Sequence, residues 1–227
     1  TCAKGASYTL DKVNHAHDDF LKTRRQLMNK SLLALALLTV SGTAMAQSPQ
    51  WNKIEVSYLD STVDVGASEP SFDGLGLSGS AVITDNWIVF TDYKTIDAEA
   101  NGANADLEFL SAGAGAFKRV TDTTDIYTTI SVERLDISGS ATALSVSDDD
   151  MGYGIGIGVR SMLIPLLEVG AKIDYVDIDD TDVFRAQANA FYHFTKNLSA
   201  GIGYETYRPS DVDLDIDTVS VSFRYTF

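Results

Sequence analysis

The fold is decided by the stretch Val219-Ser220-Val221-Ser222-Phe223-Arg224-Tyr225-Thr226-Phe227. Every odd position carries an apolar or aromatic residue, and every even position carries a small or polar one. A period of two gives a β-strand one apolar face and one polar face. Aromatic residues end the run, at the place where a membrane boundary would fall. A soluble antiparallel strand would alternate in the same way, so the stretch predicts a bilayer-crossing strand, with its apolar face toward lipid, only because the pattern repeats along the chain behind an export signal.

An export signal precedes the alternating segments. Met28-Asn29-Lys30 provides a basic start, Leu32 to Val40 an apolar stretch, and Ala44-Met45-Ala46 a cleavage site. The apolar stretch is shorter than the about 20 residues that a spanning helix needs. We predict that residues 28–46 are a cleaved signal peptide and that residues 47–227 form the folded domain. Residues 1–27 are predicted to be a disordered, non-native upstream extension.

The composition excludes several classes of function. The chain has 17 Lys and Arg against 32 Asp and Glu, a formal net charge of −15. Nucleic-acid phosphates require basic partners, so we expect no nucleic-acid binding. The single cysteine, Cys2, lies in the extension, so the folded domain is expected to have no disulfide. Beyond the signal no stretch is apolar enough for a transmembrane helix, so strands must form any membrane span.

Turn signals divide the rest of the chain into ten alternating segments, and about 9–11 residues suffice for each to cross a bilayer. An open sheet in lipid would leave backbone groups unpaired, so the sheet must close. We predict an all-β fold, a closed antiparallel up-and-down transmembrane β-barrel of ten strands, with eight strands as the fallback. The segments are 51–60, 72–84, 87–97, 105–119, 125–137, 150–162, 166–177, 182–195, 198–208 and 214–227.

The connections between segments are of two kinds. Four are predicted to be short turns, at 84–86, at 120–124, around Pro165 and at 195–197. Five are predicted to be longer acidic loops, and short turns opposite long loops are typical of an outer-membrane barrel. The acidic residues assigned to these loops are Asp60, Asp64, Glu69, Asp73, Asp97, Glu99, Asp148, Asp149, Asp150, Asp177, Asp179, Asp180, Asp182, Asp211, Asp213 and Asp215.

The last acidic run raises the question of a metal. Hard cations such as calcium prefer carboxylate oxygens. An EF-hand loop needs a glycine and a final glutamate at fixed positions, and the run lacks both. We therefore predict no metal site, with Asp211, Asp213 and Asp215 as weak candidates for divalent bridging to lipopolysaccharide phosphates. The simpler interpretation is a solvated loop surface.

The outward faces are expected to carry two aromatic belts, because such residues prefer membrane interfaces. The facing of segment 105–119 stays undecided, because Leu107 and Phe109 have one parity and Leu110, Ala112 and Ala114 the other. The belt residues are Trp87, Tyr192, Tyr225 and Phe227 at the turn end and Tyr58, Tyr93, Tyr153 and Tyr175 at the loop end.

The inward faces collect charges of both signs. An unpaired buried charge is costly, so we expect these side chains to pair and fill the lumen. A continuous water-filled pore is the alternative. Gly152, Gly154, Gly156 and Gly158 also point inward, and leave room either for long side chains opposite or for a constricted channel. The predicted lumen charge network is Lys53, Glu55, Glu133, Arg160, Glu168, Lys172, Asp174, Arg185, Glu205 and Arg224.

Several motifs together resemble small bacterial outer-membrane β-barrel proteins, the porin-like barrels grouped with the outer-membrane-protein-A-type barrel domain. They are the Ala-Met-Ala signal, the Gly-x-Gly cores at 113–115, 154–156 and 201–203, the turns at 85–87 and 196–198, and Phe227. The ten-strand layout is most similar to members described as diffusible-signal-regulated elicitor proteins. The resemblance implies the outer membrane of a Gram-negative bacterium. It also implies that the outer-membrane assembly machinery recognises the last strand through Phe227.

The positions of the histidines indicate whether the protein could be an enzyme. Outer-membrane proteases, deacylases, acyltransferases and phospholipases depend on a histidine or a serine–histidine pair. Of the three histidines, only His193 follows the signal, and it lies near the turn end with an inward side chain. General-base work at the outer rim therefore has no histidine. We predict that the protein is not an enzyme and carries no cofactor.

The leading functional hypothesis is a structural or porin-like envelope protein with a lumen largely filled by side chains. One alternative is a small cation-favouring or small-solute channel, whose acidic mouth concentrates cations. Another is a surface interaction protein acting through its acidic extracellular loops. The expected partners are outer-membrane lipid, lipopolysaccharide and the assembly machinery.

Overall fold

The computed structural model describes residues 48–64, 71–100, 103–141, 144–179, 181–210 and 215–227. The predicted extension and signal peptide lie outside the described residues, so their boundaries stay predictions. No helix among the residues described is long and apolar enough to cross a membrane.

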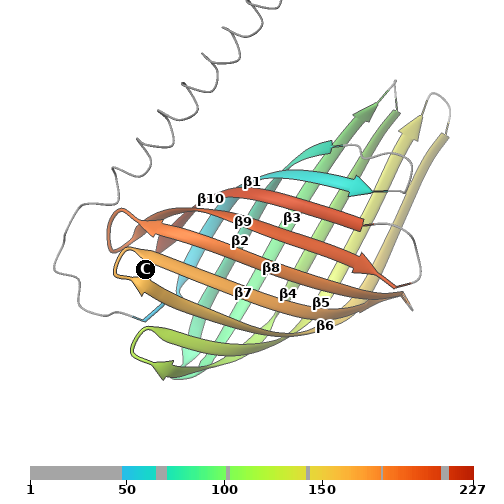
Figure 1. Cartoon of the computed structure of the whole chain (residues 1–227). Coiled ribbons are helices and arrows are strands. Elements are labelled where there is room, and N and C mark those ends of the chain that lie inside the picture. Colours follow the sequence, from blue (N-terminus) through green and yellow to red (C-terminus); the bar gives the residue numbers. More distant parts are fainter. Residues whose placement is uncertain (1–47, 65–70, 101–102, 142–143, 180, 211–214) are drawn as a thin grey trace, which may run out of the picture. The chain divides into compact units, whose positions relative to one another are not determined.

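Ten antiparallel strands close into a barrel (Figure 1), in the order β1-β10-β9-β8-β7-β6-β5-β4-β3-β2. Each strand pairs with its neighbours in sequence, and β1 pairs with β10 to close the ring. The predicted ten-strand up-and-down barrel is confirmed, and the eight-strand fallback is wrong. The strands are β1 (Lys53–Asp64), β2 (Ser71–Thr84), β3 (Trp87–Ala100), β4 (Ala103–Thr121), β5 (Thr124–Ala141), β6 (Leu144–Ile164), β7 (Leu167–Ile178), β8 (Thr181–His193), β9 (Leu198–Pro209) and β10 (Asp215–Thr226).

The four predicted short turns are present, between β2 and β3, β4 and β5, β6 and β7, and β8 and β9. Of the five predicted longer loops, those between β1 and β2 and between β9 and β10 have six and five residues, but the prediction was wrong for the other three. β5 and β6, for example, are separated by only two residues, 142 and 143. The strands instead continue past the predicted boundaries. Acidic residues that alternate with apolar ones fit a strand with one face in water, so they do not by themselves indicate a loop. Strands hold Asp60, Asp64, Asp73, Asp97, Glu99, Asp148, Asp149, Asp150, Asp177, Asp182 and Asp215.

Of the remaining acidic residues, Asp179 follows β7 directly and has a positive φ of 46°. This is the left-handed conformation that aspartate tolerates better than most residues, and it lets the chain reverse into β8. Glu69, Asp180, Asp211 and Asp213 lie outside the described residues.

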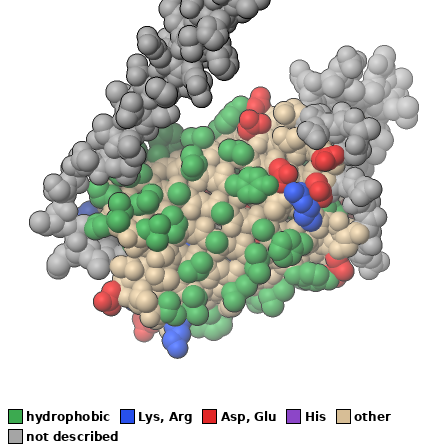
Figure 2. Space-filling model, in the orientation of Figure 1, with side chains coloured by type: hydrophobic (Ala, Val, Ile, Leu, Met, Phe, Trp, Pro, Cys, Tyr) green, Lys and Arg blue, Asp and Glu red, His purple; other side chains and the backbone are tan. Residues whose placement is uncertain are grey.

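Two bands of opposite polarity divide the barrel along its strands. In the first, which we call the membrane band, apolar side chains point outward, and Figure 2 shows them distributed over the outer wall. Ile130, Ile155 and Val221 are examples, each at least half exposed. The second, which we call the rim section, lies at the loop end, where apolar side chains point inward. Its inward residues include Val63, Phe72, Leu107, Leu135, Ile137, Val176, Ile178, Val183, Pro209 and Ile216.

The facing of β4 follows from these two bands. Leu110 points outward and is exposed, whereas Ser111 is buried in the lumen. The ring of Phe109 stacks on that of Tyr207 inside the barrel, with 5.4 Å between centroids. The odd positions of β4 therefore face inward, which settles the parity that the sequence left undecided.

Candidate functional site in the barrel lumen

Trp51 lies across the turn end of the lumen. It lies two residues before the start of β1, yet its indole Nε1 donates a 3.0 Å hydrogen bond to Oδ2 of Asp125 on β5. The indole ring stacks on Phe117 and meets Tyr127 edge-on, at centroid distances of 5.1 and 5.0 Å. The Arg160 guanidinium on β6 lies 4.4 Å from the ring centroid. One side chain therefore joins the start of β1 to strands on the other side of the ring.

The first charge cluster surrounds Glu168, which is 1% exposed. Its Oε1 accepts hydrogen bonds from Arg160 at 2.7 Å and from Arg224 at 2.9 Å. Arg224 also donates to Glu55 at 3.0 Å, and Lys53 bonds the same carboxylate at 3.2 Å. The cluster links β6 and β7 to β10 and β1, so it spans the lumen rather than lining one wall.

Two aromatic and polar contacts complete this cluster. The Arg224 guanidinium lies 3.4 Å from the ring centroid of the buried Phe191. His193 Nε2 lies 3.5 Å from Glu168 Oε2, so the histidine is a neighbour of the charge cluster near the turn end. The backbone oxygen of Gln50 accepts a 3.0 Å hydrogen bond from Arg160, which ties the segment before β1 to the cluster.

The second charge cluster is centred on Arg185. Both of its terminal nitrogens lie 3.3 Å from the Glu133 carboxylate, and its Nε lies 3.3 Å from Asp174. Lys172 pairs with Asp174 at 2.7 Å. Glu133 additionally accepts hydrogen bonds from Ser111 and Ser131, at 2.9 and 2.6 Å. These bonds neutralise each charge, as a buried ion pair requires.

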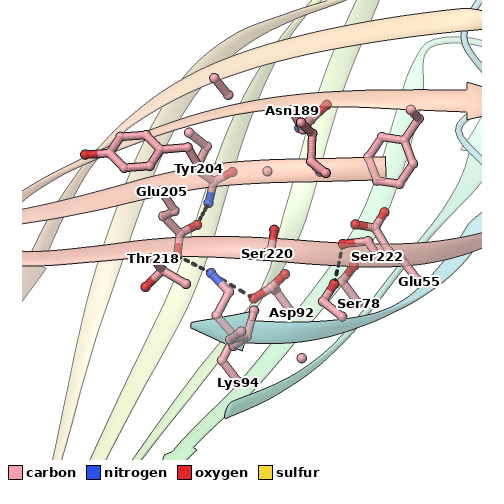
Figure 3. Close-up of a pocket in the computed structure, with 18 of the residues that line it drawn as sticks. Glu55, Ser78, Asp92, Lys94, Asn189, Tyr204, Glu205, Thr218, Ser220 and Ser222 are labelled. Atoms are coloured by element: carbon pink, nitrogen blue, oxygen red, sulfur yellow. Dashed lines mark hydrogen bonds and ion pairs between the residues drawn. The ribbon is translucent and has the colours of Figure 1, made fainter. Parts of the chain in front are cut away.

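A third cluster lies around Lys94 (Figure 3), whose ammonium group points between Asp92 and Glu205. Lys94 hydrogen-bonds Glu205 and, at 3.2 Å, the hydroxyl of Tyr207. Gln187 hydrogen-bonds the other oxygen of Glu205. All ten residues of the predicted lumen network therefore face the interior, and the three clusters hold them in ion pairs.

Two small polar cavities remain between the clusters. One cavity, of about 100 Å³, is lined by the residues drawn in Figure 3. The other, of about 140 Å³, lies beside Trp51, Arg160 and Arg224. Both are lined by Ser78, Asp92, Gln187 and Asn189, so they adjoin. Polar cavities of this size hold a few water molecules.

The inward glycines of β6 make room for side chains of the neighbouring strands. A Cβ on Gly158 would lie 2.4 Å from the Tyr127 ring, and one on Gly156 would lie 2.2 Å from Asp174 Oδ1. A Cβ on Gly152 would lie 2.0 Å from the backbone oxygen of Asp177. These inward glycines therefore leave space that side chains and backbone of the two neighbouring strands, β5 and β7, occupy.

The residues of the two predicted aromatic belts lie on the outer wall. Tyr93 and Tyr192 are half-buried, and the other six are exposed. At the loop end, three outward tyrosines hydrogen-bond an aspartate on an adjacent strand: Tyr58 with Asp73, Tyr175 with Asp182, and Tyr204 with Asp217 at 2.9 Å. Their role as membrane-interface belts stays a prediction.

The structure brings no metal ligands together in the part of the chain that it describes, where no group of three or more His, Cys, Asp and Glu could hold an ion. Of the weak candidates, Asp215 pairs with Arg208 at 3.3 Å, while Asp211 and Asp213 lie outside the described residues.

Sequence reasoning missed four lumen residues. Trp51 was assigned to the first strand and given no role, and Asp92, Lys94 and Asp125 were not included in the network. Parity on β3 could have found Asp92 and Lys94, because they alternate with the outward Val89 and Tyr93. No local signal could have found the contact between Trp51 and Asp125, since it joins segments 74 positions apart.

A family model described as outer membrane protein beta-barrel domain matches residues 31–194, more than half of the chain. The protein belongs to the outer-membrane β-barrel family. The barrel is thus a protein of the Gram-negative outer membrane, as the sequence predicted. No curated protein matches it significantly in sequence.

Solved structures similar to this barrel have low sequence identity to it. Ail, the attachment invasion locus protein of Yersinia pestis, is 15% identical, with 79% of this chain and 100% of Ail covered and a TM-score of 0.44. The outer membrane protein OprG from Pseudomonas aeruginosa is 13% identical, with 81% and 99% covered and a TM-score of 0.41. The translocator domain of the autotransporter NalP from Neisseria meningitidis is 14% identical, with 92% and 98% covered and a TM-score of 0.44.

Proposed function

We propose that this barrel is a structural or porin-like protein of the outer membrane whose lumen is filled by side chains and passes no steady ion current. The observation that carries the proposal is the position of Trp51, which reaches from the start of β1 to Asp125 on β5. β1 and β5 are not neighbours in the ring, so the contact crosses the lumen.

The charge clusters support the same proposal. Glu168 is bonded by arginines from two strands, and Arg185 by carboxylates from two others. Opening a pore through these pairs would separate opposite charges that now pair inside the barrel. A lumen built in this way stabilises the barrel wall, and it needs no ligand or reaction.

The experiment is single-channel conductance of the refolded protein in a planar bilayer, after heat-modifiable gel migration has shown that it is folded. We expect no steps from the unaltered protein and discrete steps from Trp51→Ala. Trp87→Ala is the matched control, because Trp87 is exposed on the outer wall and its removal leaves the lumen unchanged. Steady steps from the unaltered protein would overturn the proposal.

The second candidate function is a channel for small cations or other small solutes. The observation that favours it is the pair of adjoining polar cavities, which share four lining residues and run between the charge clusters. The outward carboxylates of the rim, such as Asp60 and Asp73, would raise the local cation concentration. Cation-selective steps from the unaltered protein in the same bilayers would support this candidate.

We also propose two interactions of the outer surface. We propose that outward carboxylates at the loop end bind lipopolysaccharide phosphates through divalent cations. The alternating strand that ends in Phe227 is proposed as the segment that the outer-membrane assembly machinery recognises. Loss of calcium-dependent lipopolysaccharide binding in a variant with Asp60→Asn and Asp73→Asn, in a barrel that still folds, would support the first.

A further inference from the structure

The rim section has the polarity of a water-soluble barrel. On β7, Ile173 and Tyr175 point outward and Asp174 points inward, as in the rest of the membrane band. One residue further the pattern reverses: Val176 is buried inside the barrel, and Asp177 is exposed on the outer wall. The same reversal occurs on β5, where Val132 points outward while Leu135 and Ile137 line the interior. Beyond the lipid boundary, water therefore meets carboxylates outside and apolar side chains face each other inside.

These apolar side chains do not fill the space between them. They line a chamber of about 380 Å³, far larger than either polar cavity below it. Protein interiors are close-packed, so a void of this size is unusual in a section whose only task is stability. Ile137 points into the barrel and is still 42% exposed. Eight of the ten strands contribute to the wall, which includes Val63, Phe72, Leu107, Phe109, Val183 and Ile216.

The floor of the chamber offers no free charge to a ligand. It is formed by Arg185, Glu133 and Tyr207. Arg185 bonds Glu133 with both terminal nitrogens, and Asp174 with its Nε. The hydroxyl of Tyr207 bonds Lys94, and its ring stacks on Phe109. An ionic group that entered would lose its water and find each floor charge already neutralised, which is costly.

We propose that the rim chamber is a binding site for one uncharged, largely apolar small molecule. Barrels of about this strand number hold one small ligand when their interior is not filled by side chains. A volume of 380 Å³, an apolar wall and a few polar groups at one end are the properties of a small-molecule site. Because the charge clusters lie across the lumen beneath the chamber, the site faces the outer side of the membrane.

The test uses the full folded chain in lipid nanodiscs, titrated with the neutral fluorescent probe 1-aminoanthracene. We expect saturable binding of one probe per barrel, after subtraction of the linear background from probe that partitions into empty nanodiscs. Val183→Trp places a large side chain in the chamber and should weaken binding at least tenfold. Val219→Trp is the matched control, because Val219 is exposed on the outer wall, and its binding should be unchanged. Heat-modifiable gel migration establishes that each variant is folded.

The outcomes separate this proposal from others. Leu107→Trp, on β4, fills the chamber from another strand and keeps the test decisive if Val183→Trp fails to fold. Binding that does not saturate, or that survives in both filled variants, would overturn the proposal. Equal affinity for the anionic probe 1-anilinonaphthalene-8-sulfonate would overturn the preference for uncharged ligands. Trp51→Ala should bind the neutral probe normally, so failure of the closed-lumen proposal would not imply failure of this one.

Discussion

Trp51 and Asp125 are joined by a hydrogen bond of 3.0 Å although 74 positions separate them in the chain. Both side chains are almost entirely buried, at 7% and 0% exposure. The indole nitrogen has no second partner among the described residues, and the carboxylate is also paired with Arg119 at 3.5 Å. The segment before β1 is thus held in the turn end of the barrel by this bond, by ring stacking and by the hydrogen bond that Arg160 donates to the Gln50 backbone oxygen.

Asp125→Leu should therefore destabilise the barrel. The change leaves the Trp51 nitrogen buried without an acceptor, and such an unsatisfied group costs about 1–3 kcal/mol. The measurement is urea unfolding in lipid vesicles, followed by tryptophan fluorescence. Asp122→Leu is the control, because Asp122 is exposed in the turn between β4 and β5 and should change the free energy of unfolding little.

Arg224 and Glu55 should show strong energetic coupling. Arg224→Met leaves Glu55 buried with only Lys53 as its partner, and breaking a buried pair costs about 3–5 kcal/mol. Arg224→Met combined with Glu55→Met removes both charges, so its loss of stability should be smaller than the sum of the single losses. A double-mutant cycle on the free energy of unfolding measures this difference, and strict additivity would contradict it.

Gly152 is required for the close approach of β6 and β7. A Cβ at this position would lie 2.0 Å from the backbone oxygen of Asp177, which cannot move without shifting the strand. Gly152→Ala should therefore lower the stability by about 1–3 kcal/mol, the usual cost of overpacking. Gly76→Ala is the matched control, because its Cβ would meet Ser57 at an ordinary 3.4 Å. Equal stability of the two variants would contradict the prediction.

The boundary between the membrane band and the rim section can be located with single lysines. Ile130 is exposed on the outer wall of the membrane band, so Ile130→Lys should cost about 2–4 kcal/mol, as for a cation near the bilayer midplane. Met151 also points outward but pairs with Arg134 at the start of the rim section, so Met151→Lys should cost about 0–1 kcal/mol. The comparison is made by unfolding in vesicles, and similar costs at both positions would place the boundary elsewhere.

The sequence predicted the strand number, the turns and most facings because each depends on a local period of two. The prediction failed where the apolar face of a strand changes from the outer wall to the interior. Alternation states that two faces differ, but not which face meets water, so Leu107 and Phe109 seemed to conflict with Leu110 and Ala112. The two pairs do not conflict in the structure, because the first faces the rim chamber and the second faces lipid. The acidic residues were assigned to loops for the same reason, since a strand in water outside the membrane was not considered.

The lumen was predictable only in part. Parity placed the charges inside, and the cost of burial required them to pair. Which arginine meets which carboxylate depends on the shear and diameter of the ring, as when Arg224 reaches Glu168 three strands away. The contact of Trp51 depends on how the segment before β1 folds back, and no periodicity records this.

The pairing of β1 with β10 has a kinetic consequence. Ser57 and Ser222 bond across this seam at 2.7 Å, and 165 positions separate them. The ring therefore cannot close until the final strand has left the ribosome and crossed the inner membrane. Until then, both edges of the sheet present unpaired backbone groups, which promote aggregation. We therefore expect the chain to cross the periplasm with its sheet unclosed, so that aggregation during transit, rather than the stability of the finished barrel, limits its yield.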